Sequence, residues 1–214
     1  MALNANRELM LRNVRFSFLY AFEPQINAQS GKKSYGTHLI LAPDHPQIKD
    51  INAAILDIAK EKWPQGWEAI IKQLKTQDRI CFRQGDTKLD KQGNVVDGYA
   101  GQRYITTSRK NPFPVLETRG GVNVQLTAAD GRPRSGDYGN AHIQLWVLDV
   151  PGDQGGRRIC CTPLGIQYVR KGTPLGGGAR VSSVEEFGVE PSDADADAPV
   201  PASASNGVAD DLLG

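Results

Sequence analysis

The sequence has few cysteines and histidines and no long apolar run. Its three cysteines, Cys81, Cys160 and Cys161, are an odd number with one adjacent pair, which is not a disulfide framework. There is no CxxC motif and the three histidines lie far apart in the chain, so we expect no structural zinc site. No run of about 18 apolar residues occurs, which argues against a membrane span. The first ten residues include Arg7 and Glu8 and lack an apolar centre, so we expect no signal peptide and predict a cytoplasmic protein.

The common catalytic motifs are missing as well. The run from Gly31 to Ser34 (GKKS) is similar to the end of a P-loop, but that motif needs a glycine five positions before Gly31, where Ile26 stands. We find no GxGxxG unit between a strand and a helix, no GxSxG and no HExxH. The carboxylates of the body are scattered, with no DxD-like cluster to hold Mg²⁺. We therefore predict a protein without enzymatic activity, metal or cofactor.

Charge is distributed very unevenly along the chain. Residues 184–214 contain no Lys or Arg and hold eight of the 24 acidic residues. Residues 1–183 hold all 25 basic residues and the other 16 acidic residues, which leaves a net charge of +9. A basic body joined to an acidic tail indicates a nucleic-acid partner.

The tail, residues 182–214, is rich in Ala, Asp, Pro, Ser and Gly. Such a segment cannot bury enough apolar surface to offset its ordering entropy, so we predict that it is disordered. Four residues close to its end, Asp210, Asp211, Leu212 and Leu213, depart from this composition. We predict that they form a short hook for a partner protein, with a chance chain end as the alternative.

The sequence of the body predicts strands interrupted by one helical insertion. Residues 9–22 alternate apolar and polar side chains, and residues 35–41 follow as a second strand after a polar turn. Apolar residues then recur at spacings of three and four over 47–62, which predicts a helix that ends before Pro64, and 66–74 predicts a short second helix. Further strands are predicted at 79–83, 99–108, 141–150 and within 157–169, with 114–117 extended. The predicted fold class is mainly β: an OB-fold-like five-stranded barrel over residues 1–181 with a helical insertion.

Basic and aromatic residues are interleaved on the predicted strands and turns, as single-stranded nucleic acid requires. Lys and Arg neutralise phosphates, and flat rings stack on bases at about 1–3 kcal/mol each. Three groups supply candidate DNA-binding residues: Arg15, Phe16, Phe18 and Tyr20 with Lys32, Lys33 and Tyr35; Tyr99, Arg103, Tyr104, Arg109 and Lys110; and Arg132, Arg134 and Tyr138, followed later by Arg157, Arg158, Tyr168, Arg170 and Lys171. The second group is the strongest, with a solvated edge as its alternative. For Lys32 and Lys33 the alternative interpretation is a solvated turn. We expect Phe16, Phe18 and Trp146 in the core, and Trp63 and Trp67 against the helices.

Five segments resemble a family of bacteriophage single-stranded-DNA-binding proteins with OB folds. They are VRFSFLYAFEP (14–24), GKKSYGTHLIL (31–41), YITTSRKNPFPVL (104–116), YGNAHIQLWVLD (138–149) and GIQYVRKGTPLGGG (165–178), and they cover most of residues 12–180. The resemblance implies sequence-tolerant binding of single-stranded DNA, a role in phage replication or recombination, and an acidic tail that contacts replication proteins. Many tails of this family end in an aromatic residue, whereas this one ends in Leu212-Leu213-Gly214.

We therefore predict a non-enzymatic protein that binds and protects single-stranded DNA in the host cell cytoplasm. Its predicted partners are single-stranded DNA and, through the tail, phage or host replication proteins, with no membrane contact. Self-association is left open. A phage nuclease or recombination enzyme, or a structural phage protein that contacts packaged DNA, is the alternative.

Overall fold

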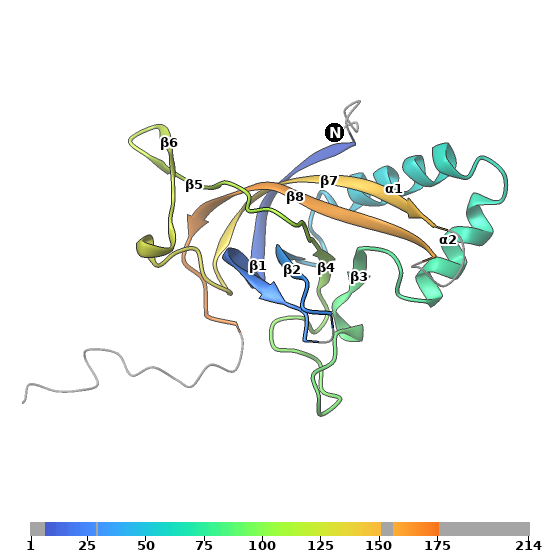
Figure 1. The fold of residues 1–214 in the computed structure, drawn as a ribbon, viewed down its shortest axis with the longest axis horizontal. Coiled ribbons are helices and arrows are strands. Elements are labelled where there is room, and N and C mark those ends of the chain that lie inside the picture. Colours follow the sequence, from blue (N-terminus) through green and yellow to red (C-terminus); the bar gives the residue numbers. More distant parts are fainter. Residues whose placement is uncertain (1–6, 29, 151–155, 176–214) are drawn as a thin grey trace, which may run out of the picture. The chain divides into compact units, whose positions relative to one another are not determined.

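The computed structural model describes residues 7–28, 30–150 and 156–175 of the 214-residue chain. The described residues form an eight-stranded sheet in the order β3-β4-β2-β1-β7-β8-β5-β6 (Figure 1). Neighbouring strands are antiparallel except β5 and β8, which are parallel. The strands are β1 (Glu8–Ile26), β2 (Lys33–Leu41), β3 (Phe82–Gln84), β4 (Arg103–Thr106), β5 (Val115–Arg119), β6 (Val122–Gln125), β7 (Tyr138–Asp149) and β8 (Arg157–Arg170).

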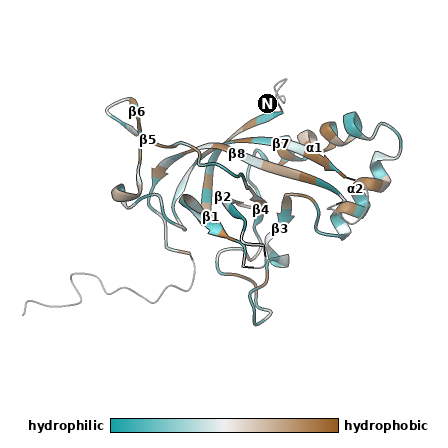
Figure 2. Ribbon diagram, viewed as in Figure 1, coloured by the Kyte–Doolittle hydropathy of each residue, from teal (hydrophilic) through white to brown (hydrophobic). Residues whose placement is uncertain are grey.

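Alternation of apolar and polar residues along the strands buries one face of the sheet (Figure 2). In β7, Ala141, Ile143 and Leu145 are buried, each separated by a half-buried residue. In β1 the alternation of buried and exposed residues is interrupted between Leu11 and Val14, which are both buried. The reason is that the pairing of β1 with β7 shifts by one residue there. The shift is a β-bulge, and it changes which side chains of β1 point inward.

Residues that flank β3 and β4 also bond to β8. The Cys81 N–H donates to the Ile159 carbonyl (2.9 Å), and the Ile159 N–H donates to the Arg79 carbonyl (3.0 Å). After β4, the Ser108 N–H donates to the Cys161 carbonyl (3.1 Å). The sheet is therefore curved, and its β3–β4 end approaches β8. The mainly-β class with a helical insertion is confirmed, while the five-stranded barrel stays a prediction.

Two helices, α1 (Ile48–Lys62) and α2 (Trp67–Thr76), form the insertion between β2 and β3 (Figure 1). One face of α1 packs against β7 with Ile51, Ile55 and Ile58 buried. Trp63 is buried directly after α1, where its indole N–H donates to Asp149 Oδ2 (3.0 Å). The predicted helices and the packing role of Trp63 are confirmed. In the part of the chain that the structure describes, no helix is both long and apolar enough to span a membrane.

A loop of residues 85–102, here called the strap, covers the outer face of β2 and β4. Tyr99 of the strap packs with Tyr104 and Ile40 and, from beyond β8, with Leu175, in a second apolar cluster. The strap closes at Gly85, whose N–H donates to the Gln102 carbonyl (2.7 Å). A Cβ atom at Gly85 would lie 1.9 Å from the Tyr99 carbonyl oxygen, so only glycine fits there.

Candidate nucleic-acid interface

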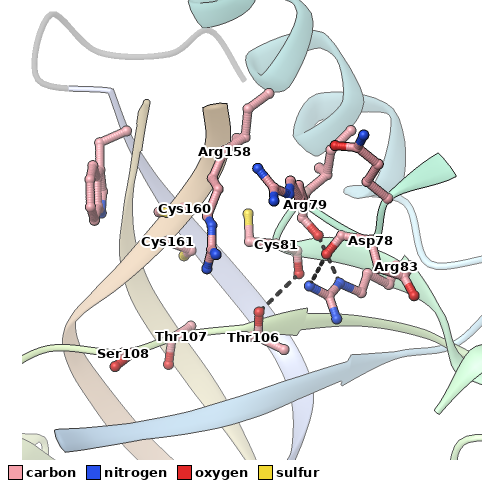
Figure 3. A pocket seen from close by; sticks show the side chains of 14 residues that line it. Asp78, Arg79, Cys81, Arg83, Thr106, Thr107, Ser108, Arg158, Cys160 and Cys161 are labelled. Atoms are coloured by element: carbon pink, nitrogen blue, oxygen red, sulfur yellow. Dashed lines mark hydrogen bonds between the residues drawn. The ribbon is translucent and has the colours of Figure 1, made fainter. Parts of the chain in front are cut away.

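Two adjoining pockets lie where the chain leaves β4, because Thr107 bonds there to Thr37 of β2 and Ser108 bonds to Cys161 of β8. The first, the ring pocket, has a volume of about 370 Å³ and is lined by Phe18, Tyr20, Tyr35, His38 and Lys88, among others. The second, the arginine pocket, has a volume of about 410 Å³ and is lined by Arg79, Arg83, Arg158 and Trp146, among others (Figure 3). Both pockets are also lined by Thr106, Thr107 and Ser108. The two pockets therefore adjoin along this segment, and together we call them the groove.

A backbone irregularity in β1 places Phe18 in the ring pocket. Phe18 has a φ of 46°, in the left-handed region, and the pairing of β1 with β2 shifts between Ser17 and Tyr20. As a result Phe16 is fully buried, whereas Phe18 is 37% exposed. The Phe18 ring lies 5.0 Å from the His38 ring, between centroids, and the Lys88 Nζ atom lies 5.2 Å from the Phe18 centroid. The ring pocket thus presents an open ring beside a cation.

His38 is a neutral member of this cluster. Burial, and then the charges of Lys88 and Arg83, lower the pKa of His38 to about 3. Its Nδ1 atom is hydrogen-bonded to the Tyr99 hydroxyl (2.8 Å). Burial and the charge of Arg83 also lower the pKa of Lys88. Like charges thus repel one another here, and a phosphate anion would relieve that repulsion.

The arginine pocket gathers cations from separate elements. Arg79 precedes β3, Arg83 lies in β3 and Arg158 lies in β8, and all three surround the same hollow (Figure 3). Backbone carbonyls hold the Arg83 guanidinium, because its Nε donates to the Ile80 oxygen (2.9 Å) and its Nη2 to the Asp78 oxygen. Trp146 is 37% exposed, and its indole N–H donates to the Thr162 hydroxyl (3.0 Å). The pocket therefore combines positive charge with an oriented, accessible ring.

The three cysteines line the arginine pocket as free thiols. Burial, together with the nearby Cys81, raises the pKa of Cys160 to about 11. Burial also raises the pKa of Cys161, which is hydrogen-bonded with Cys81. Cys160 and Cys161 are therefore protonated near neutral pH, so they are poor nucleophiles.

Part of the predicted site lies at the groove. Tyr35 lines the ring pocket and pairs with Arg109, each N–H donating to the other's carbonyl (2.8 Å). The Arg109 Nη1 atom donates to the Pro163 oxygen (3.1 Å), which fixes the guanidinium next to β8. Lys110 follows as an exposed residue, and Lys32 and Lys33 are exposed at the start of β2. The structure thus brings Tyr35 and Arg109 together and leaves the three lysines on the surface.

Tyr99 and Tyr104 were predicted to stack on bases, but the structure buries both side chains. The two residues are 0% and 2% exposed, and their rings meet edge to face with centroids 5.1 Å apart. A base cannot stack on either ring, because the strap and β4 bury both. Arg103, from the same predicted group, lies with its guanidinium carbon 4.8 Å from the Phe82 ring centroid and lines neither pocket of the groove.

Most of the third predicted group lies outside the groove, although its Arg158 lines the arginine pocket. Arg132 is paired with Glu117 through two hydrogen bonds (2.9 and 3.0 Å), and its guanidinium lies 5.8 Å from the Tyr168 ring centroid. Arg134 donates to the Gly131 carbonyl (2.7 Å) on an exposed turn. The structure does bring Tyr138 and Arg170 together in a ring–cation contact, and Lys171 is exposed after them. The predicted partner-binding residues Asp210, Asp211, Leu212 and Leu213 lie outside the described residues, as does the predicted boundary at residue 182.

Two groove residues were predicted to be in the core, and that prediction is wrong. Phe18 and Trp146 are each 37% exposed, whereas Phe16 is buried as expected. The signal for Trp146 was present, because Ile143 and Leu145 define the buried face of β7 and Trp146 falls on the other one. No such signal exists for Phe18, since its exposure depends on the bulge in β1.

Comparisons with known proteins point to one group. A family described as "Enterobacter phage Enc34, ssDNA-binding protein" matches residues 7–198. Protein p50 of Acyrthosiphon pisum secondary endosymbiont phage 1 is 34% identical over 183 residues, which cover 84% of this chain and 92% of that protein. The single-stranded DNA-binding protein from bacteriophage Enc34, solved in complex with ssDNA, superposes with a TM-score of 0.62 at 17% identity, over 81% of this chain and 92% of that one. The single-stranded DNA binding protein gp2.5 of bacteriophage T7 superposes with a TM-score of 0.53 at 10% identity, over 83% and 99% of the two chains. The two structural matches show a shared fold.

Proposed function

The chain belongs to the family of Enterobacter phage Enc34 ssDNA-binding proteins, and we propose that it binds single-stranded DNA in the groove. One observation carries this proposal: the arginine and ring pockets adjoin at Thr106, Thr107 and Ser108, so cations and accessible rings lie next to each other. Unpaired nucleotides need both kinds of group, because their backbone is anionic and their bases are exposed.

The proposed binding mode is tolerant of sequence. Lys88 and Arg83 attract the phosphates, and release of the counterions condensed on the strand makes binding depend steeply on salt. Phe18 and Trp146 offer ring faces, on which any base can stack. A duplex keeps its bases stacked inside, so it cannot use these rings. The groove is therefore expected to prefer single strands.

The wider role proposed is protection of single-stranded DNA during phage DNA replication or recombination, in the cytoplasm of the host. Coating the strand requires binding alone, so we propose no catalytic step. The acidic tail, with Asp210, Asp211, Leu212 and Leu213 near its end, is proposed to recruit replication proteins. Deletion of residues 210–214 is expected to abolish binding to those proteins and to leave the affinity for single strands unchanged.

The groove is tested with two substitutions and a matched control. Phe18→Leu keeps an apolar side chain but removes the stacking face, and Lys88→Gln removes one cation. Fluorescence anisotropy with a labelled oligothymidylate should give weaker binding for both variants, and a shallower salt dependence for Lys88→Gln alone. The control is Val122→Ala, which trims an apolar residue that is 65% exposed in β6, outside the groove. Unchanged affinity in both groove variants would contradict the proposed site.

A further inference from the structure

A second cationic hollow lies on the outer face of β1, β2 and β7, separate from the groove. It has a volume of about 310 Å³ and shares no lining residue with either pocket of the groove. Its polar lining consists of Asn13, Arg15, His45, Gln102 and Tyr138. Arg170 of β8 lies beside it, stacked on Tyr138. We call this site the arginine–tyrosine hollow.

Strand register places two arginines around one ring. Tyr138 of β7 pairs with Arg15 of β1 on one side and with Arg170 of β8 on the other. The guanidinium carbons of Arg170 and Arg15 lie 3.6 and 5.7 Å from the Tyr138 ring centroid. Since the Arg170 guanidinium carbon lies only 3.6 Å from the Tyr138 ring centroid, it occupies the place that a base would take, and the role of Tyr138 is to position the two arginines.

Both guanidinium groups are held in place by neutral partners. Arg15 donates through Nε to the Gly136 oxygen (3.1 Å) and through Nη2 to the Thr173 oxygen (2.7 Å). Arg170 donates to the Asn13 side-chain oxygen (3.4 Å). Among the described residues, neither arginine forms an ion pair with a carboxylate. The Asp137 carboxylate, next to Tyr138, is already occupied by the backbone N–H groups of Arg134 and Gly172.

Two positive charges fixed next to the same ring repel each other, and an anion between them would be stabilised by both. Phosphate oxygens suit this arrangement, because guanidinium groups bind them with charge-assisted hydrogen bonds. The amides of Asn13 and Gln102, which line the same hollow, can donate to and accept from the edge of a base.

We propose that the arginine–tyrosine hollow binds a phosphodiester group of the same DNA strand that occupies the groove. This inference rests on the proposed function and extends it, because it adds a second contact on the far side of the strap. His38 of the ring pocket and Ala42 of the hollow are four residues apart at β2, which corresponds to about 13 Å along a strand. A strand long enough to cross the strap therefore reaches both sites, whereas a short one reaches only the groove.

The test compares Arg170→Gln with the wild-type protein on oligothymidylates of increasing length, over about 4–16 nucleotides, the range of site sizes known for OB folds. Arg170 is exposed, so its replacement is not expected to unfold the protein. On the longest oligomer, the slope of log affinity against log salt should become shallower by about 0.7, the value for one phosphate contact on a single strand. On the shortest oligomer, wild type and variant should have the same slope. Arg170→Lys should restore the slope, because it restores the charge.

The matched control is Arg119→Gln, which removes an arginine that is already paired with Glu117 and Asp130. This substitution should leave the salt-dependence slopes on the shortest and the longest oligomer unchanged. An Arg170→Gln effect that is equal at all lengths, or absent at all lengths, would overturn the inference while leaving binding in the groove intact. Failure of the wild-type protein to bind any oligomer would overturn the proposed function and the inference together.

A free phosphate ion could use the same chemistry, and a competition experiment separates the two sources. Inorganic phosphate, added at constant ionic strength, should displace the longest oligomer more from the wild type than from Arg170→Gln, because it competes with the strand for the hollow. Equal displacement from both proteins would mean that the strand does not occupy the hollow and would refute its assignment to DNA.

Discussion

Replacing Trp146 by leucine should weaken binding of single-stranded DNA and lower stability only modestly. Removal of a stacking ring costs about 1–3 kcal/mol per base. Trp146 is only 37% exposed, so it offers part of its surface to a base, and we expect the lower half of that range, about 1–2 kcal/mol. This corresponds to roughly a 5- to 30-fold rise in Kd. Because the side chain lies on the outer face of β7 and the leucine variant loses only the hydrogen bond to Thr162, the free energy of unfolding should fall by about 1 kcal/mol.

Two signals measure this effect in one titration. Anisotropy of a labelled oligothymidylate gives the affinity, and intrinsic fluorescence reports stacking on the indole. The chain has three tryptophans, of which Trp63 is 5% exposed and Trp67 packs against the core from α2. Quenching by DNA should therefore come mainly from Trp146. Trp146→Leu should lose most of the quenching, whereas the control Trp67→Phe should retain it. Full affinity and full quenching in Trp146→Leu would refute the assignment of this ring to the DNA path.

Three further predictions concern the strap and the thiols. Tyr99→Phe leaves a half-buried nitrogen of His38 without its hydrogen bond, so urea denaturation should show that the free energy of unfolding falls by about 1 kcal/mol. Equal stability of variant and wild type would mean that this bond contributes nothing. The pKa of His38 is about 3 in the folded protein, against the ordinary value of 6.5. Between these two pH values the unfolded state binds one more proton than the folded state. The free energy of unfolding should therefore fall as the pH is lowered from 6.5 to 3. His38→Gln should remove that part of the pH dependence, and identical slopes for wild type and variant would contradict a neutral His38. Cys160 should be alkylated slowly at neutral pH, because its pKa is about 11. Mass spectrometry should show that alkylation becomes slower still when oligothymidylate is bound. An alkylation rate that DNA does not change would place the strand away from the arginine pocket.

The sequence was sufficient to predict most elements of the fold. Period-two alternation predicts β1, β2, β7 and β8, and the spacing of Ile48, Ile51 and Ile55 predicts α1. Strand β6 was not predicted, because all four of its residues are exposed and it lacks a buried face. Residues 99–102 were predicted as part of a strand, but they belong to the strap and only Arg103–Thr106 pairs in the sheet.

The candidate site was harder to predict than the fold, for two physical reasons. A positive φ at Phe18 changes the phase of β1, and nothing in the alternation of Phe16 and Phe18 reveals it. The burial of Tyr99 and Tyr104 depends on the strap and on Leu175, which lies about 70 residues beyond them in the chain. Residue type alone indicates aromatic and basic chemistry, but tertiary contacts decide which rings are accessible.

The central claim is that the groove joins positive charge to accessible rings and therefore accepts unpaired nucleotides. Its most direct test is a salt titration of wild-type binding to matched single- and double-stranded oligonucleotides. We predict that the single strand binds more tightly at every salt concentration, with affinity falling steeply as salt rises. Equal or tighter binding of the duplex, or affinity for the single strand that does not depend on salt, would contradict the claim.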